Sequence, residues 1–331
     1  MRKKYPPILT LALMLLFIFS SLAAQEVYEM TVAPDGTSDY TSIQKAIDNC
    51  KSFPDKRITI YVKNGVYREK IVVPSCNPQI SLIGEDPEKT IITNGDYFDK
   101  MNRGRNSTFF TYTLLVIADD FHAENITIEN SAGPVGQAIA LFVRGDRCVF
   151  RNCRITGHQD TLYTDGFNAR HYFENCYIDG TTDFIFGPST ALFKYCVIHS
   201  KKNSYITAAS TPQGNSFGYV FLDCKLTADE GVDKVYLGRP WRDYAKVVFI
   251  RCEMGQHILP EGWSNWSGTE RDKTAFYAEY ANTGAGSAAS QRVAWSHQLT
   301  RKEAKKYTPA NILKPRTPEE PNMEFWIREG L

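Results

Sequence analysis

The chain has 331 residues, a hydrophobic share of 43% and a formal net charge of +1 at pH 7. A charge this close to zero argues against strong electrostatic capture of nucleic acid, so we expect no nucleic-acid partner. The hydrophobic share is ample for one large core.

The first 24 residues have the pattern of a secretory signal peptide. Three basic residues precede an apolar run over 8–19, and small residues follow up to Ala24. The run is shorter than the ~20 residues that a membrane anchor needs. We therefore expect cleavage of 1–24 during export to the periplasm or the cell exterior, which leaves no membrane anchor. The net charge falls to −2 because three basic residues are lost.

Residues 25–331 are expected to form one domain, because no Pro-, Gly- or Ser-rich linker and no block of like charge divides them. Within 39–47, the helical spacing of Ile43, Ala46 and Ile47 after polar capping candidates predicts a short helix. Four short β-branched segments separated by Gly, Pro or Asn then predict strands. They are 58–62, 70–73, 80–83 and 90–92.

A six-residue pattern recurs six times from about residue 120, with apolar residues or Cys at its first, fourth and sixth places. The copies begin at Ala123, Phe150, Phe173, Phe193, Phe221 and Phe249. Their spacings of 27, 23, 20, 28 and 28 residues are too long for hairpins and too short for strand-helix-strand units. They predict the coils of a solenoid. Asn at the third place of the first three copies suits a bend.

The predicted fold is therefore an all-β, single-domain right-handed parallel β-helix with a short N-terminal helix. A solenoid needs covers over its open ends. The C-terminal tail departs from the repeat, with a Gly-rich stretch at 282–286 and a helical stretch at 300–307. We expect this helical and irregular tail to act as a cap.

Two aspartates occupy the same position in consecutive coils. Asp160 and Asp183 lie seven residues after Cys153 and Cys176, the fourth places of their copies. Adjacent strands are about 4.8 Å apart, so the two carboxylates should be neighbours on one face. Both stand beside apolar or aromatic residues, where desolvation can separate the pKa values of an acid and a base. The alternative is a pair of solvated surface aspartates.

Five motifs resemble, in the same order, those of the pectinesterase (pectin methylesterase) family, whose members are parallel β-helices that cleave methyl esters of polygalacturonate. They are 65–69, 136–141, 157–163, 183–187 and 237–241. The resemblance covers nearly the whole mature chain and suggests a secreted member of bacterial type. It implies hydrolysis of pectin to methanol and pectate by a monomer without cofactor. The sequence contains no His-x-x-x-His or Cys-x-x-Cys pair, so we expect no metal.

Carried over by motif, the family's nucleophile falls on Asp183 and its general acid/base on Asp160. The oxyanion-stabilising amides fall on Gln137 and Gln159, and the arginine that holds the nucleophile falls on Arg239. The positions matched to the family's sugar groove are Trp241, Tyr163, Phe186 and Trp263. His158 departs from the family, which often has an aromatic residue there, and could alter subsite preference or pH response.

The residues themselves support ester cleavage by carboxylates. No Gly-x-Ser-x-Gly elbow is present, whereas an aspartate pair can supply a nucleophile and a proton donor. Each residue also has a structural alternative: a surface amide for either Gln, a surface salt bridge for Arg239, and a core position for Trp241 or Trp263.

Other functions stay open at this point. A thioesterase or another acyl-ester hydrolase could use the same scaffold. A β-helix pectate lyase would need clustered acids for calcium, and a polygalacturonase would need further paired acids and a basic clamp. A carbohydrate-binding solenoid without catalysis would tolerate the loss of Asp160, Asp183 or Arg239, yet all three are present.

Five of the eight cysteines stand at the fourth place of a copy, which predicts an inward ladder of small apolar side chains. Related bacterial enzymes of the family suggest that Cys176 and Cys196 can be bridged. In-register neighbours fit the ~4.4–6.8 Å Cα separation of a disulfide, and free thiols are the alternative.

Overall fold

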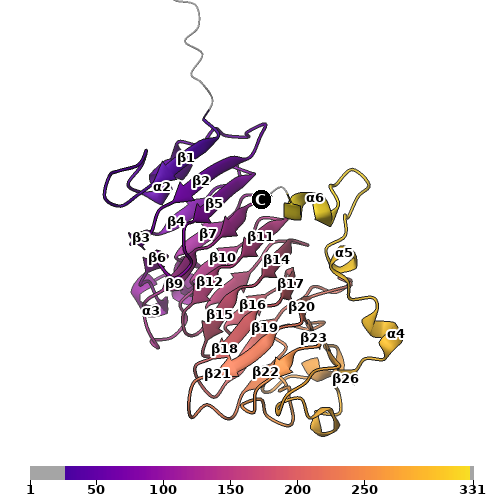
Figure 1. Cartoon of the computed structure of the whole chain (residues 1–331). Helices are drawn as coiled ribbons and strands as arrows, with labels where there is room; N and C mark the ends of the chain where they lie inside the picture. The colour runs from indigo at the N-terminus through magenta and orange to yellow at the C-terminus, as the bar shows by residue number, and fades with distance from the viewer. Residues whose placement is uncertain (1–26, 329–331) are drawn as a thin grey trace, which may run out of the picture.

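The computed structural model describes residues 27–328, so the predicted signal peptide lies outside the described residues. Successive coils stack in sequence order into three parallel sheets, as the column of arrows in Figure 1 shows. Each strand pairs with its counterparts in the neighbouring coils, which confirms the predicted right-handed parallel β-helix.

Sheet A has eleven strands: β1 (Glu29–Val32), β2 (Ile58–Val62), β5 (Ile80–Gly84), β8 (His122–Glu124), β11 (Cys148–Arg151), β14 (Arg170–Glu174), β17 (Thr190–Lys194), β20 (Tyr219–Leu222), β23 (Lys246–Ile250), β25 (Phe276–Tyr280) and β26 (His297–Gln298). Sheet B has eight: β3 (Gly65–Tyr67), β6 (Thr90–Asn94), β9 (Thr127–Asn130), β12 (Arg154–Thr156), β15 (Tyr177–Gly180), β18 (Val197–Ser200), β21 (Lys225–Ala228) and β24 (Glu253–Met254). Sheet C has seven: β4 (Ile71–Val73), β7 (Leu114–Val116), β10 (Leu141–Val143), β13 (Leu162–Thr164), β16 (Ile185–Gly187), β19 (Tyr205–Ala209) and β22 (Tyr236–Gly238).

The helices are short and lie outside the sheets. They are α2 (Ile43–Asp48), α3 (Phe98–Met101), α4 (Arg301–Ala304), α5 (Pro309–Ile312), α6 (Met323–Arg328) and the 3₁₀ turns η1 (Gly104–Phe110), η2 (Arg271–Lys273) and η3 (Ala289–Gln291). None of the helices within 27–328 is long and apolar enough to cross a membrane.

The elements predicted near the N-terminus are confirmed. Helix α2 begins after Ser42, whose side chain accepts a hydrogen bond from Lys45 N, and it buries Ile43, Ala46 and Ile47. Strand β2 has the predicted bounds, and β4, β5 and β6 start or end within two residues of theirs.

The repeat explains the turn between sheets A and B. Its third place is a left-handed residue in all six copies, with φ between 49° and 57°. These residues are Asn125, Asn152, Asn175, Tyr195, Asp223 and Arg251. Asn tolerates this conformation best, which is why the first three copies revealed the bend in the sequence. Tyr195 and Arg251 adopt it because the pairing on both sides dictates the path of the chain.

The inward places of the repeat form the core. The phenylalanines at the first place stack face to face across successive coils, with ring centroids 4.2–5.0 Å apart from Phe150 to Phe249. The cysteines at the fourth place form the predicted inward ladder and are at most 2% exposed. All eight cysteines are free thiols, so the suggested Cys176–Cys196 bridge is absent from this structure. The sulfur atoms of this pair donate instead to the carbonyl oxygens of Phe150 and Phe173.

The helical C-terminal tail is present, but it runs back along the outer face of sheet A instead of stopping at an open end (Figure 1, yellow). Leu299, Ile312, Leu313 and Trp326 of the tail join a second apolar cluster with outward residues of sheet A such as Leu192. The tail therefore covers a sheet face that would otherwise expose apolar side chains.

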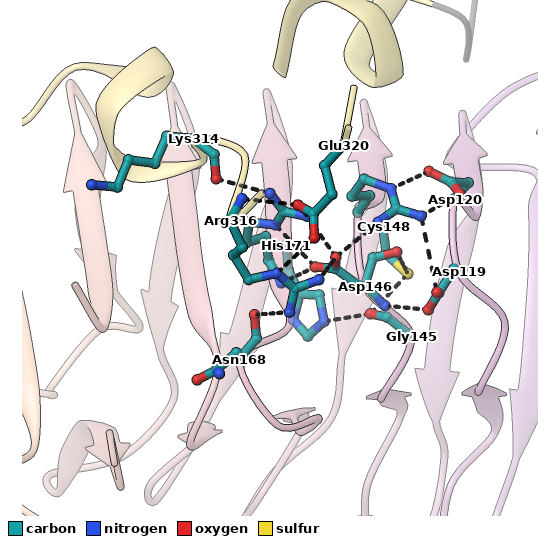
Figure 2. A network of polar contacts seen from close by, with 12 residues as sticks. Asp119, Asp120, Gly145, Asp146, Cys148, Asn168, His171, Lys314, Arg316 and Glu320 are labelled. Carbon is teal, nitrogen blue, oxygen red and sulfur yellow. Dashed lines mark hydrogen bonds and ion pairs between the residues drawn. The ribbon is translucent and has the colours of Figure 1, made fainter. Parts of the chain in front are cut away.

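A network of ion pairs fastens this tail to the solenoid (Figure 2). The carboxylate of Asp146, which is 7% exposed, accepts hydrogen bonds from Arg170 at 2.6 Å and from Arg316 of the tail. Glu320 of the tail pairs with Arg170 at 2.8 Å, and Arg170 donates to the carbonyl oxygen of Lys314 at 2.8 Å. Charge-assisted contacts thus hold the tail in addition to apolar packing.

Candidate active site

The two aspartates of the repeat are neighbours, as predicted. Leu162 of β13 pairs with Ile185 of β16, and Asp160 and Asp183 each stand two residues before these partners. Both aspartates adopt left-handed backbone conformations, with φ of 66° and 49°. Strain of this kind in residues other than Gly often marks functional sites.

The pair opens into a pocket of about 360 Å³ on the outer face of sheet C. Seven of the predicted site residues line it: Gln137, Gln159, Asp160, Asp183, Phe186, Arg239 and Trp241. Asp160 and Asp183 are only 9% and 7% exposed, so their carboxyl groups are largely withdrawn from water. The stacking of coils thus brings together residues that lie far apart in the sequence.

Arg239 is held in one orientation against Asp183. Its Nε and Nη2 donate to the two carboxylate oxygens of Asp183 at 3.0 and 2.7 Å, a two-pronged contact. The guanidinium also lies over the rings of Tyr205 at 4.0 Å and Trp266 at 4.2 Å. The preceding Gly238 is needed where β22 packs on β19, because a Cβ there would lie 1.9 Å from Thr207 Oγ1.

The two carboxyl groups differ in protonation. Burial raises the pKa of Asp160 well above its usual range, and the charge of Asp183 raises it further while Arg239 opposes the shift. Burial also raises the pKa of Asp183, but the hydrogen bonds and charge of Arg239 act directly against that rise. The arrangement therefore favours a proton on Asp160 and a negative charge on Asp183.

The two glutamines lie one above the other beside the acids. Gln137 and Gln159 are joined by an isolated parallel β-bridge, and both side chains line the pocket. Their backbone oxygens accept hydrogen bonds from Phe98 N and Ala138 N at 2.9 and 3.0 Å. Among the described residues, neither side-chain amide has a hydrogen-bond partner. Both amides are therefore available to donate to a bound oxyanion.

A family model described as Pectinesterase matches residues 29–316. The chain belongs to the pectinesterase family. Pectinesterase 31 of Arabidopsis thaliana is 40% identical over 292 residues, which cover 86% of this chain and 92% of that protein.

Solved structures of the family are similar over most of the chain. A pectin methylesterase from carrot matches with a TM-score of 0.81 and 33% identity, over 86% of this chain and 92% of that chain. A pectin methylesterase in complex with a hexasaccharide matches with a TM-score of 0.76 and 27% identity, over 89% of this chain and 99% of that one. Pectinesterase 31 and the carrot enzyme are plant proteins, so the expectation of a bacterial-type pectinesterase is not supported.

The aromatic residues expected in the pectinesterase groove separate into three groups. Phe186 and Trp241 line the pocket, with ring centroids 5.8 Å apart. Tyr163 is 7% exposed and stacks under Phe186 at 4.6 Å, so it supports the pocket wall without lining it. Trp263 is 1% exposed and packs in the core between Phe249 and Tyr277. The expected groove position of Trp263 is therefore wrong, because its side chain points into the solenoid.

Five further residues line the pocket and were missed in the sequence: Arg105, Thr108, Phe109, Ala208 and Trp266. Trp266 lies three residues after Trp263 in the sequence, and it lines the pocket where Trp263 had been expected. Thr108 and Phe109 belong to η1, in the unusually long connection between β6 and β7. The length of that connection was the signal that could have drawn attention to it, since long loops in compact domains are often functional.

His158 does not line the pocket, although it precedes Gln159 in sequence. It is half-buried, and burial lowers the pKa of its imidazole, with the charge of Lys201 adding to the effect. The Lys201 ammonium is held beside it by the carbonyl oxygen of Gly157 at 2.8 Å. The side chain is thus a neighbour of the pocket and not part of its wall.

Proposed function

We propose that this pectinesterase hydrolyses the methyl esters of pectin, releasing methanol and leaving pectate. The single observation that carries the proposal is the buried pair Asp160 and Asp183 with a guanidinium fork on only one of them. Such a site keeps one carboxylate charged as a nucleophile and the other protonated as an acid.

In the proposed reaction, ionised Asp183 attacks the ester carbonyl carbon and the carbonyl oxygen becomes an oxyanion. The amides of Gln137 and Gln159 donate hydrogen bonds to this oxyanion. As the tetrahedral intermediate collapses, the bond to methoxide breaks and Asp160 gives its proton to the departing methanol. The product is an anhydride between the galacturonate carboxyl and Asp183.

The second half of the reaction restores the enzyme. Asp160, now ionised, takes a proton from water, and the resulting hydroxide attacks the acyl carbon. The bond to Asp183 breaks, which frees the galacturonate carboxyl and returns charge to Asp183. Arg239 holds Asp183 in place throughout, because its fork is fixed between Tyr205 and Trp266.

The groove suits a polysaccharide. Phe186, Trp241 and Trp266 line the pocket beside the acids, and aromatic side chains are common in the walls of ligand pockets. The hexasaccharide complex of the similar pectin methylesterase supports the same class of substrate for this chain. Thioester or other acyl-ester hydrolysis and chain cleavage by a lyase or galacturonase are the alternatives that the test must separate.

The test is methanol release from highly methylated pectin by the wild type and by Asp183→Asn. Loss of the nucleophile should lower kcat by at least ~10²-fold. Asp165→Asn is a matched control, because Asp165 lies near the groove but pairs with Arg144 at 2.9 Å and has no assigned step. Unsaturated or shortened products without methanol would reject the proposal. So would Asp183→Asn retaining more than about a tenth of the wild-type rate while folded.

We further propose that 25–331 is one domain that acts as an exported monomer. The match over 29–316 and the continuous stacking of coils support one domain. N-terminal sequencing of exported protein tests the cleavage after Ala24, and size-exclusion chromatography with light scattering tests the monomer.

A further inference from the structure

The C-terminal tail concentrates positive charge on a face away from the catalytic pocket. Residues 301–316 contain six Lys or Arg residues and one Glu, a formal charge of +5, although the whole chain carries only +1. The rest of the chain is therefore net negative. Helices α4 and α5 hold this stretch against sheet A, whereas the catalytic pocket opens on sheet C (Figure 1). The tail is thus a separate positive region, which attracts anions.

A groove lies between this tail and the connection from β19 to β20. Two adjoining cavities of about 410 and 280 Å³ form it, and both have Ser216, Phe217 and Lys314 in their walls. Phe217 meets Tyr307 of the tail edge to face, with ring centroids 5.4 Å apart, and its carbonyl oxygen accepts a hydrogen bond from Thr190 Oγ1 at 3.0 Å. This tail groove therefore has a fixed, partly apolar wall and the size of a ligand site.

Two lysines bring unneutralised charge to the tail groove. Lys306 and Lys314 are exposed and line it, and within 27–328 neither ammonium group makes an ion pair or a hydrogen bond. Figure 2 shows the Lys314 side chain directed away from the ion pairs around Asp146. Glu303, the acid nearest to Lys306 in sequence, uses its carboxylate on Thr300 N and Oγ1 at 2.8 and 2.7 Å. Both ammonium groups are therefore available to an external anion.

Uncharged hydrogen-bonding groups stand in the same wall. The side-chain amides of Asn168 and Asn215 and the hydroxyl of Ser216 line the larger cavity, and among the described residues none of the three has a hydrogen-bond partner. Amides and hydroxyls bind the hydroxyl groups of sugars, while ammonium groups bind carboxylates. Together with the apolar wall, this set matches a chain of uronic acids better than a bare phosphate, which has no apolar surface.

We propose that the tail groove is a second binding site, which holds a de-esterified galacturonate chain by its carboxylates on Lys306 and Lys314. The inference rests on the proposed function, because that reaction supplies this polymer as its product. A chain bound at sheet A leaves the catalytic pocket on sheet C open. The enzyme can therefore stay attached to pectate through the tail while its catalytic pocket acts on another chain.

The test is the binding of fluorescently labelled, unmethylated hexagalacturonate, followed by fluorescence anisotropy. The double variant Lys306→Gln/Lys314→Gln should bind about 3- to 30-fold more weakly than the wild type, the range for two exposed charge contacts. Lys302→Gln/Lys305→Gln is the matched control, because it removes the same charge from α4 and its C-cap but neither residue lines the tail groove. Salt should weaken binding by the wild type, since exposed charges are screened.

Catalysis on a neutral substrate should not depend on the tail groove. Fully methyl-esterified trigalacturonate carries no free carboxylate, so it offers no ligand to Lys306 and Lys314. Its rate of methanol release should therefore be the same in the wild type and in both double variants. An unchanged rate also shows that the variants are folded.

The outcomes separate this inference from the proposed function. Equal affinity of the wild type and Lys306→Gln/Lys314→Gln for hexagalacturonate rejects the second site and leaves the esterase standing. An equal loss in Lys302→Gln/Lys305→Gln assigns the effect to general charge and rejects it too. So does an oligothymidylate of equal charge that binds as tightly and is lost in the same variant. If the wild type releases no methanol from pectin, the proposed function falls, and the hexagalacturonate measurement still decides whether the groove binds uronic acids.

Discussion

Replacement of Arg239 by Gln tests how the charge is placed on Asp183. The change removes the positive charge but keeps a planar amide between Tyr205 and Trp266. Removing a cation makes a neighbouring carboxylate easier to protonate, so the pKa of Asp183 should rise. Because protonated Asp183 cannot attack the ester, the acidic limb of the pH profile for kcat/KM should move to higher pH.

The structure sets the size of this shift. A cation within ~4–6 Å lowers the pKa of an acid by about 1–3 units. Here two contacts of 2.7 and 3.0 Å join the guanidinium to a carboxylate that is 7% exposed, so the upper half of that range is expected. At a pH below the acidic limbs of both the wild type and the variant, each unit of pKa shift lowers the rate about tenfold, or about 1.4 kcal/mol in transition-state free energy.

The assay is methanol release from methylated pectin across pH, with circular dichroism to confirm that each variant is folded. Arg239→Lys is the matched control, since it keeps the charge but loses the fork, and its limb should move less than that of Arg239→Gln. Near neutral pH, Arg239→Gln should recover part of its activity as Asp183 ionises. A folded Arg239→Gln whose acidic limb coincides with that of the wild type would refute the assignment.

Two further predictions concern stability. Trp263→Ala should lower the free energy of unfolding by ~3–5 kcal/mol because it empties a core position, which urea unfolding measures. Trp241→Ala should leave the free energy of unfolding nearly unchanged and should raise KM, which steady-state kinetics measure. Burial lowers the pKa of His171 from 6.5 to about 4, so the unfolded chain binds the extra proton first and stability should fall as pH drops from 6.5 to 4. His171→Gln should flatten this slope by about 2–3 kcal/mol over that window, and an unchanged slope would contradict the prediction.

The sequence predicts the positions of residues that lie within the repeat. The register of β13 on β16 is set by in-phase apolar places, so the proximity of Asp160 and Asp183 could be inferred from their common offset after Cys153 and Cys176. Residues outside the repeat have no such phase. The pattern around 261–266 contains two tryptophans three residues apart, and no periodicity decides which one turns inward.

The same reasoning explains the other features that could not be predicted from the sequence. The segment that carries Arg105 is an insertion between β6 and β7, and its path depends on contacts with distant parts of the chain, such as Lys70 donating to the carbonyl oxygen of Phe110. The tail contains recognisable helices, but its course along sheet A depends on Asp146 and Arg170, which lie far away in sequence. Long-range ion pairs of this kind leave no local signal.

A stacked repeat places two acids in equivalent positions, whereas ester hydrolysis by this pair requires them to differ. The coil geometry alone supplies the same offset, a similar left-handed backbone and similar burial for Asp160 and Asp183. The difference must therefore come from a residue that contacts only one of them. Arg239 does so, and it directly follows β22, which lies two coils beyond β16 in sheet C. Its fork is held by Tyr205 and Trp266, so the asymmetry is built into the resting structure and need not form when substrate binds.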